Sequence, residues 1–125
     1  MRSSLKLTAT CHCGAVEIDV PHKPRRLTSC NCSICRRTRS LWAYYPAAKV
    51  RIRHKRGDVD RYAWGDRMID MVRCANCGIL MCWLPTRRAK NQERMGVNAC
   101  NLDPSVIEGV RVRRLDGAST WKFLD

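Results

Sequence analysis

Nine cysteines in a chain of 125 residues constrain this fold more than any other feature of the sequence. Cysteines with only one or two residues between them are poorly placed to bridge each other, but well placed to bind one metal ion. The total is odd, and residues 1–10 lack the apolar run of a secretory signal, so a disulfide framework of the secreted type is disfavoured. We therefore predict metal ligation in a cytoplasmic protein. Seven cysteines fall into three clusters: Cys11 and Cys13; Cys30, Cys32 and Cys35; Cys74 and Cys77.

Two of the clusters are half-sites of the same kind. Cys11 and Cys13 are followed by Gly14, and Cys74 and Cys77 by Gly78. Glycine allows a left-handed turn, so that main-chain N–H groups can point at sulfur. Two such pairs make one closed four-thiolate zinc site. The pairs lie far apart in the chain, so zinc binding, on the order of 10 kcal/mol in small zinc domains, would stabilise the fold. We predict a structural zinc here.

The third cluster, Cys30, Cys32 and Cys35, offers three thiols and no obvious fourth ligand. A zinc ion with three protein ligands keeps one position for water or substrate, as in catalytic sites. If a helix begins near Ser33, Cys32 and Cys35 share a face, and the positive helix end favours their thiolates. We predict a second zinc that is open to an external thiol. Alternatives are partial or no occupancy, a disulfide, or a closed site with a fourth ligand from His12, His54, Cys82 or Cys100.

Short β-prone runs separated by turn residues dominate the rest of the chain. The firmest hairpin signal is Gly65-Asp66, which lies between two such runs. Helices are predicted at residues 33–38 and 103–109, the second with Asp103 as cap and Pro104 in the first helical position. The sequence predicts one mainly β, mostly antiparallel domain across residues 1–125. The predicted strands are residues 5–9, 15–20, 41–45, 50–53, 59–64, 68–73, 79–84, 93–98 and 110–115.

The formal net charge of +13 predicts an anionic partner. A small acid such as glutathione, which carries two carboxylates, is one candidate. Arg36, Arg37 and Arg39 follow the third cluster directly and are candidate anion contacts. No run approaches the roughly 18–20 apolar residues that span a bilayer, so no membrane partner is predicted.

An alternative function is a non-catalytic zinc module that binds a protein or a nucleic acid. Basic stretches at residues 23–26, 49–56 and 111–114 can form a phosphate-binding face. Aromatic side chains can stack on bases, although at alternating strand positions such side chains more often pack in the core. The aromatic candidates are Trp42, Tyr44, Tyr45, Tyr62 and Trp64.

The order of the clusters resembles the glutathione-dependent formaldehyde-activating family. The shared elements are Cys-x-Cys-Gly at 11–14, Cys-x-Cys-x-x-Cys with basic residues after it at 30–37, and Cys-x-x-Cys-Gly at 74–78. Asn101-Leu102-Asp103-Pro104 and Leu115-Asp116-Gly117 with Trp121 look like that family's tail.

This resemblance implies a small zinc β-tent fold with two zinc ions per chain. Cys11, Cys13, Cys74 and Cys77 would hold the structural zinc, and Cys30, Cys32 and Cys35 a substrate-facing one. It also implies a carbon–sulfur lyase type of activity that joins glutathione to formaldehyde, giving S-hydroxymethylglutathione. The implied partners are therefore a small thiol and a small aldehyde.

Overall fold

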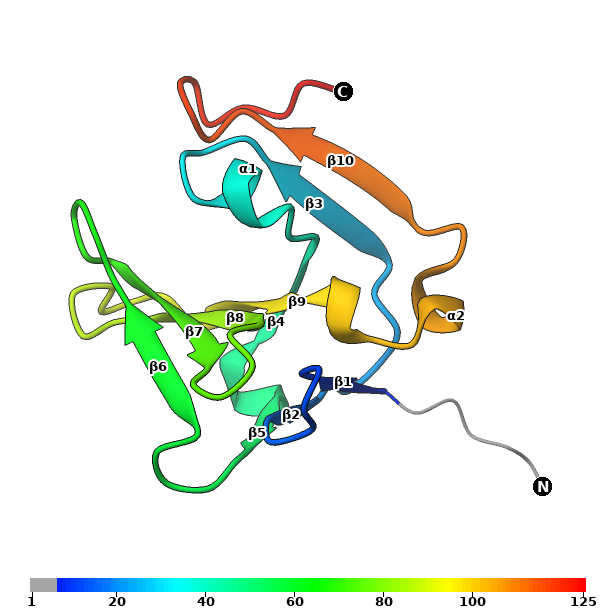
Figure 1. The fold of residues 1–125 in the computed structure, drawn as a ribbon. Coiled ribbons are helices and arrows are strands. Elements are labelled where there is room, and N and C mark those ends of the chain that lie inside the picture. Colours follow the sequence, from blue (N-terminus) through cyan, green and yellow to red (C-terminus); the bar gives the residue numbers. More distant parts are fainter. Residues whose placement is uncertain (1–6) are drawn as a thin grey trace.

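Two β-sheets make up most of the structure, a computed structural model that describes residues 7–125 (Figure 1). The small antiparallel sheet has the order β1-β2-β5 and the large sheet the order β10-β3-β4-β9-β8-β7-β6. The strands of the small sheet are β1 (Thr8–Thr10), β2 (Glu17–Asp19) and β5 (Arg51–Arg53). Those of the large sheet are β3 (Arg26–Cys30), β4 (Trp42–Pro46), β6 (Val59–Tyr62), β7 (Ile69–Cys74), β8 (Leu80–Pro85), β9 (Arg94–Asn98) and β10 (Arg111–Leu115).

This architecture confirms the predicted mainly β, mostly antiparallel fold. The pair β3 and β10 is the parallel exception, with Arg26 opposite Arg111 and Cys30 opposite Leu115. The predicted strand at residues 5–9 lies partly outside the described residues. Its described part overlaps β1.

One strand was missing from the sequence prediction. Residues 26–30 follow a proline-containing turn and show no marked β pattern, yet they form β3 between β10 and β4. Pairing with two neighbours satisfies the main-chain hydrogen bonds of this segment, so tertiary contacts override its weak local propensity.

The predicted hairpin is confirmed, because β6 and β7 pair antiparallel, with Tyr62 opposite Met71. Its connection is longer than the Gly-Asp pair suggested, since β6 ends at Tyr62 and not at residue 64. The loop turns at Gly65 and Arg67, whose φ angles are 59° and 57°. Trp64 lies in this loop and not in a strand.

Two short α-helices are present, as predicted, at α1 (Cys35–Thr38) and α2 (Pro104–Ile107). The Asp103 carboxylate accepts a hydrogen bond from the Ser105 main-chain N–H at 2.9 Å, which confirms its predicted capping role. Figure 1 shows α1 in the space between the β10–β3 part of the large sheet and the β6–β7 hairpin. Short 3₁₀ turns follow β4 and β9, at Ala47–Lys49 and Ala99–Asn101.

The main core lies where the two sheets meet. Ile18 of β2, Val72 of β7, Met81 of β8 and Val97 of β9 are buried together there. A second buried cluster lies on the α1 side of the large sheet and consists of Cys30, Cys35, Trp42, Met71 and Trp83. This second cluster positions the site described below. Within residues 7–125, no helix is long and apolar enough to cross a lipid bilayer.

Candidate metal centres and an aromatic cleft

The sulfur atoms of Cys11, Cys13, Cys74 and Cys77 converge within 4.8 Å of one another. The Cys13 sulfur lies 3.6 Å from that of Cys11 and 3.6 Å from that of Cys74. Tetrahedral zinc with bonds of about 2.3 Å to sulfur places its ligands about 3.8 Å apart, so the donor set fits this metal. The first pair lies between β1 and β2, and the second at the turn from β7 to β8. The four-cysteine cluster therefore joins the two sheets.

Main-chain N–H groups around the four-cysteine cluster point at sulfur. Val16 donates to the Cys11 sulfur at 3.3 Å and Cys77 to the Cys74 sulfur at 3.4 Å. Gly14 and Gly78 have φ angles of 84° and 80°, which confirms the predicted left-handed turns. A main-chain hydrogen bond from Ile79 lowers the pKa of Cys77 to about 6. The Ile79 hydrogen bond favours the Cys77 thiolate and therefore a bound cation.

In the second cluster, the sulfur atoms of Cys30, Cys32 and Cys35 also lie within 4.8 Å of one another. Cys30 ends β3, Cys35 begins α1, and the intervening loop carries Cys32. Cys30 and Cys35 are only 9% and 5% exposed. Hydrogen bonding with Cys35 lowers the pKa of Cys30 to about 5, and hydrogen bonding with Cys30, together with burial, raises the pKa of Cys35. Cys30 is thus shifted towards thiolate, the form of cysteine that binds a metal ion.

Two residues outside the cluster contact its sulfur atoms. The indole N–H of Trp42 in β4 donates to the Cys35 sulfur at 3.3 Å. The parallel pairing of β3 with β10 ends at Cys30 opposite Leu115, which brings the main chain of Gly117 against Cys30. A Cβ at position 117 would overlap the Cys30 sulfur, so this approach requires glycine. The Gly117 N–H also forms a hydrogen bond that helps to lower the pKa of Cys30.

The three-cysteine cluster opens onto a cleft of about 840 Å³. Tyr44, Trp83 and Met71 of its lining belong to one row of paired residues, in which Gly96 lies opposite both Tyr44 and Trp83 and Trp83 lies opposite Met71. Gly96 leaves room for the Trp83 ring, which a Cβ there would overlap. The Trp83 ring meets the Tyr44 ring edge-on, with centroids 6.1 Å apart. All four tryptophans of the chain line this cleft: Trp42, Trp64, Trp83 and Trp121.

The sequence model of the glutathione-dependent formaldehyde-activating enzymes matches residues 6–112, which include both cysteine clusters. The chain belongs to this family. A crystal structure of a Rhodobacter sphaeroides protein is also similar, with 31% sequence identity and a TM-score of 0.68. That match covers 84% of this chain and 98% of the other. Zinc, the metal that this family implies, suits two clusters built entirely of sulfur.

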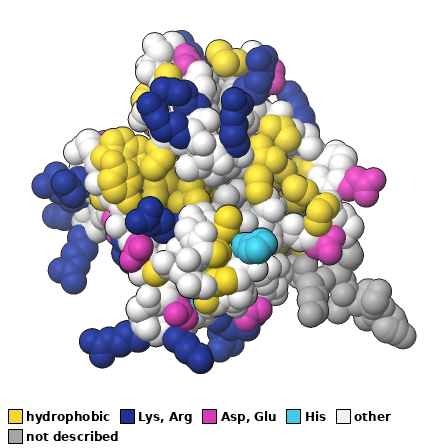
Figure 2. Space-filling model, in the orientation of Figure 1, with side chains coloured by type: hydrophobic (Ala, Val, Ile, Leu, Met, Phe, Trp, Pro, Cys, Tyr) yellow, Lys and Arg dark blue, Asp and Glu magenta, His cyan; other side chains and the backbone are white. Residues whose placement is uncertain are grey.

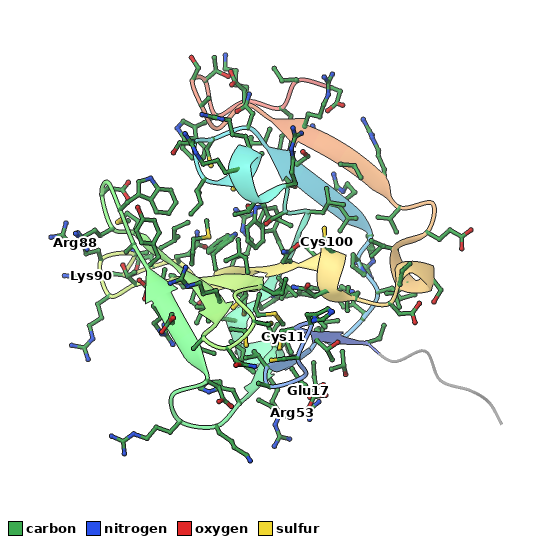
Figure 3. The ribbon with its side chains drawn as sticks, viewed as in Figure 1. Cys11, Glu17, Arg53, Arg88, Lys90 and Cys100 are labelled. Atoms are coloured by element: carbon green, nitrogen blue, oxygen red, sulfur yellow. The ribbon has the colours of Figure 1, made fainter. Side chains whose placement is uncertain are left out.

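In this member of the formaldehyde-activating family, the alternative fourth ligands lie away from the three-cysteine cluster. Among residues 7–125, no further histidine, cysteine or carboxylate joins that cluster within 4.8 Å. Cys82 is fully buried in the main core, and burial raises its pKa to about 12. Cys100 is exposed beside the main-chain carbonyl of Arg39 (Figure 3). His12 and His54 are both exposed, and the His54 ring lies against the main-chain carbonyl of Lys55.

The three arginines that follow the cluster point in different directions. Arg36 lines the cleft. Arg37 instead donates to the main-chain carbonyl of Ser33 at 2.6 Å, and Arg39 ends α1 in the left-handed conformation. Neither lines the cleft. A cationic residue that sequence reasoning missed, Arg94 of β9, lines it as well, and its guanidinium lies 4.3 Å from the Tyr44 ring centroid.

The aromatic residues considered for base stacking occupy several environments. Trp42 and Tyr45 are each 2% exposed and pack inside the protein. Tyr44 and Trp64 line the cleft. Tyr62, 54% exposed, stacks on Trp64 with ring centroids 5.7 Å apart.

Sequence reasoning also missed the contacts of Gly117 and Trp121 with the site. Both belong to the segment that resembled the family's tail, and that resemblance was the only signal for them. Asn31 holds this segment in place: its side chain donates to the Asp116 carboxylate at 3.0 Å and accepts from the Ala118 N–H at 2.9 Å.

Proposed function

We propose that this chain is a two-zinc protein of the formaldehyde-activating type, folded as one domain across residues 1–125. The observation that carries the proposal is a cluster of three thiols, without a fourth ligand among the described residues, that opens onto a cleft of about 840 Å³. Such a donor set suits a zinc ion that keeps one position for an external ligand. Cys11, Cys13, Cys74 and Cys77 would hold a structural zinc, and Cys30, Cys32 and Cys35 the open one.

The proposed reaction adds a thiol such as glutathione to a small aldehyde such as formaldehyde, an activity of the carbon–sulfur lyase class. The thiol sulfur forms a bond to the carbonyl carbon, the second carbon–oxygen bond opens, and the thiol proton ends on that oxygen. No oxidant or reductant is needed. Zinc, when bound, supplies thiolate at neutral pH by lowering the pKa of a thiol that coordinates it.

The chain's own residues would position and shield this chemistry. Trp42 donates to the Cys35 sulfur, and the main chain of Gly117 contacts Cys30, so the ligand sulfurs are fixed in place. The aromatic lining would displace water from around a bound substrate, which would strengthen electrostatic interactions there. Arg36 and Arg94 favour a substrate that carries a carboxylate.

A reducing compartment suits this proposal. All nine cysteines are free thiols in the structure, and zinc binds thiolate and not disulfide sulfur. We therefore propose a cytoplasmic location.

The decisive experiment is calorimetric titration of the zinc-loaded protein with glutathione, in the wild type and in Cys35→Ser. We expect binding in the wild type and affinity at least about tenfold lower in the variant, because the variant loses one of three metal ligands. The rate of S-hydroxymethylglutathione formation, measured by NMR exchange, should exceed the uncatalysed rate only in the wild type.

Cys100→Ser is the matched control, because Cys100 is exposed and belongs to neither cluster. It should retain both binding and rate. Absence of glutathione binding in the wild type, or equal binding in Cys35→Ser, would contradict the proposed thiol site.

A further inference from the structure

The aromatic cleft has a composition that a peptide-like thiol does not match. Beside the four tryptophans it is lined by Tyr44 and Phe123 and by apolar side chains such as Met68, Ile69 and Leu115. On the face drawn in Figure 2, hydrophobic side chains gather in patches at mid-height, with Lys and Arg side chains above and below them. A lining of this kind favours a ligand with a flat, apolar body, because aromatic rings attract one another and release water when they stack.

Positive charge is concentrated at one end of the cleft. Arg94, Tyr44 and Phe123 line both this cleft and a neighbouring cavity of about 450 Å³. That cavity adds Arg25, Arg26 and Arg113, and no acidic side chain lines it. Within residues 7–125, none of these four arginines forms an ion pair with a carboxylate side chain. Like charges gathered in one hollow repel each other, and an anion relieves that repulsion.

Arg113 gives this basic end a fixed shape. Its guanidinium lies 3.7 Å from the centroid of the Phe123 ring and donates to the main-chain carbonyl of Asp125 at 3.2 Å. Its Nε is buried and has no hydrogen-bond partner among the described residues. Buried donors without a partner are rare, and a bound carboxylate oxygen is a suitable acceptor.

Neutral polar side chains are scarce along the cleft. Asn31 and Ser33 lie beside the cysteines, and Asn31 is already engaged with Asp116 and Ala118. Asp66, the acidic residue of the lining, accepts from the Met68 N–H at 3.0 Å in its own turn. The two peptide groups of glutathione would therefore face aromatic rings and lose hydrogen bonds to water.

We propose that the preferred thiol substrate of this protein is an aromatic carboxylate, which the cleft binds more tightly than glutathione. Its ring lies against Trp64 and Trp121, the least buried tryptophans of the lining. Its carboxylate faces Arg94 and Arg113, and its thiol faces Cys30, Cys32 and Cys35. The thiol end rests on the proposed function. The aromatic and carboxylate parts rest on the cleft alone.

Calorimetry on the zinc-loaded full chain tests each part with four probes. The probes are 4-mercaptobenzoate, 4-methylbenzenethiol without the carboxylate, 4-methylbenzoate without the thiol, and glutathione. We expect 4-mercaptobenzoate to bind about tenfold more tightly than 4-methylbenzenethiol, which lacks the charge-assisted hydrogen bond. It should also bind more tightly than glutathione. Equal or tighter binding of glutathione overturns the inference.

Variants locate the binding in the cleft. Arg94→Gln should weaken 4-mercaptobenzoate about tenfold and leave 4-methylbenzenethiol unchanged. Arg87→Gln is the matched control, since Arg87 is exposed and lines neither cavity. It lies in the same β8–β9 loop as Arg88 and Lys90, which Figure 3 shows at the outer edge of the molecule. If both variants weaken 4-mercaptobenzoate binding equally, the ligand is attracted only by the net charge of the protein, and the proposed carboxylate site is overturned.

Trp121 tests the aromatic contact without disturbing the core, because it is 68% exposed. Trp121→Leu should weaken both aromatic thiols about threefold, and Trp121→Phe should restore most of the loss. Unchanged affinity in Trp121→Leu counts against ring stacking at this wall.

The probes also separate this inference from the proposed function. In one outcome, 4-methylbenzoate binds, Arg94→Gln weakens its binding, and 4-mercaptobenzoate binds no more tightly than 4-methylbenzoate. The thiol site then fails and the carboxylate site stands. In the opposite outcome, glutathione binds most tightly of the four probes, Cys35→Ser weakens its binding, and Arg94→Gln does not. The proposed function then stands and this inference fails.

Discussion

Gly117 is the residue that constrains the three-cysteine cluster most tightly. A methyl group at this position would overlap the Cys30 sulfur and come within 3.2 Å of the Cys32 Cβ. Because both neighbours are proposed zinc ligands, Gly117→Ala should displace them and weaken the second zinc site. We expect the zinc content to fall from about two to about one per chain after dialysis against a weak chelator, because disturbing the residues that support metal ligands lowers metal affinity about 10- to 100-fold. Metal analysis by atomic absorption measures this.

Ser119→Ala provides the control for this substitution, because Ser119 is exposed in the same segment and does not line the cleft. It should keep both zinc ions. Retention of both ions in Gly117→Ala would show that the close approach to Cys30 does not matter for the metal.

The buried thiol of Cys82 leads to a prediction about how the free energy of unfolding depends on pH. Burial raises the pKa of this thiol to about 12, against an ordinary value of about 9. Between these values the unfolded chain releases the proton and the folded chain keeps it, so the free energy of unfolding decreases as the pH rises. One such group contributes a slope of at most about 1.4 kcal/mol per pH unit. Urea unfolding of Cys82→Ala between pH 9.5 and 11 should therefore show a shallower decline than the wild type.

The comparison uses slopes because Cys82→Ala also leaves a small cavity, which lowers stability equally at every pH. Cys100→Ala should follow the wild-type slope, because its side chain is exposed. Identical slopes in all three proteins would mean that Cys82 is not buried as described. Zinc content should be unchanged in both variants.

At the scale of elements, the four-cysteine cluster connects the two sheets at their turns, beside the core that they share. It joins the β1–β2 turn of the small sheet to the β7–β8 turn of the large sheet. Three strands of three residues each form the small sheet, and sheets this short depend on outside support. Binding free energy of a structural zinc is folding free energy in small domains.

Cys77→Ser should therefore destabilise the protein far more than Cys35→Ser. We expect Cys77→Ser to lose one zinc and to unfold at least about 10 °C lower, since several kcal/mol are lost from a small domain. Cys35→Ser should lose the other zinc and melt within a few degrees of the wild type. Circular dichroism melts with metal analysis measure both. A larger loss in Cys35→Ser would reverse the proposed structural and open roles.

At the scale of the whole molecule, the net charge of +13 favours nucleic-acid binding as the main alternative to the proposed function. Figure 2 shows Lys and Arg side chains at the top, left and bottom of one face and not in a single stripe. Some of this charge is already paired, as in Arg53 with Asp19 at 2.8 Å. Trp42 and Tyr45 are buried and are unavailable to stack on bases.

We therefore expect weak, sequence-independent binding to duplex DNA that depends on phosphate alone. The affinity should fall by about 10³-fold or more between 50 and 200 mM salt if about six or more phosphates are contacted. Fluorescence anisotropy with two unrelated duplexes measures this, and Cys35→Ser should behave like the wild type. Tight binding to one duplex that survives moderate salt would favour the non-catalytic nucleic-acid module.

Local patterns in the sequence were enough to predict much of this molecule. The Cys-x-Cys-Gly and Cys-x-x-Cys-Gly spacings predicted two turns with left-handed glycines, because ligand geometry is local to a few residues. Alternating β-prone runs predicted most strands, and the Asp103-Pro104 pair predicted α2 for the same reason. The convergence of four sulfurs from two distant pairs also followed, since each pair alone is half of a tetrahedral site.

Contacts between distant segments decided the rest. Residues 26–30 form a strand because β10 and β4 flank them, and the register of β3 on β10 places Gly117 against Cys30. The row through Tyr44, Gly96, Trp83 and Met71 exists only because four strands are paired in one register. Sequence by itself determined which residues can bind metal, since the thiol side chains and their short spacing are properties of the sequence alone. Tertiary structure alone decided what faces the open cluster, because a cleft is made of side chains that only sheet pairing brings together.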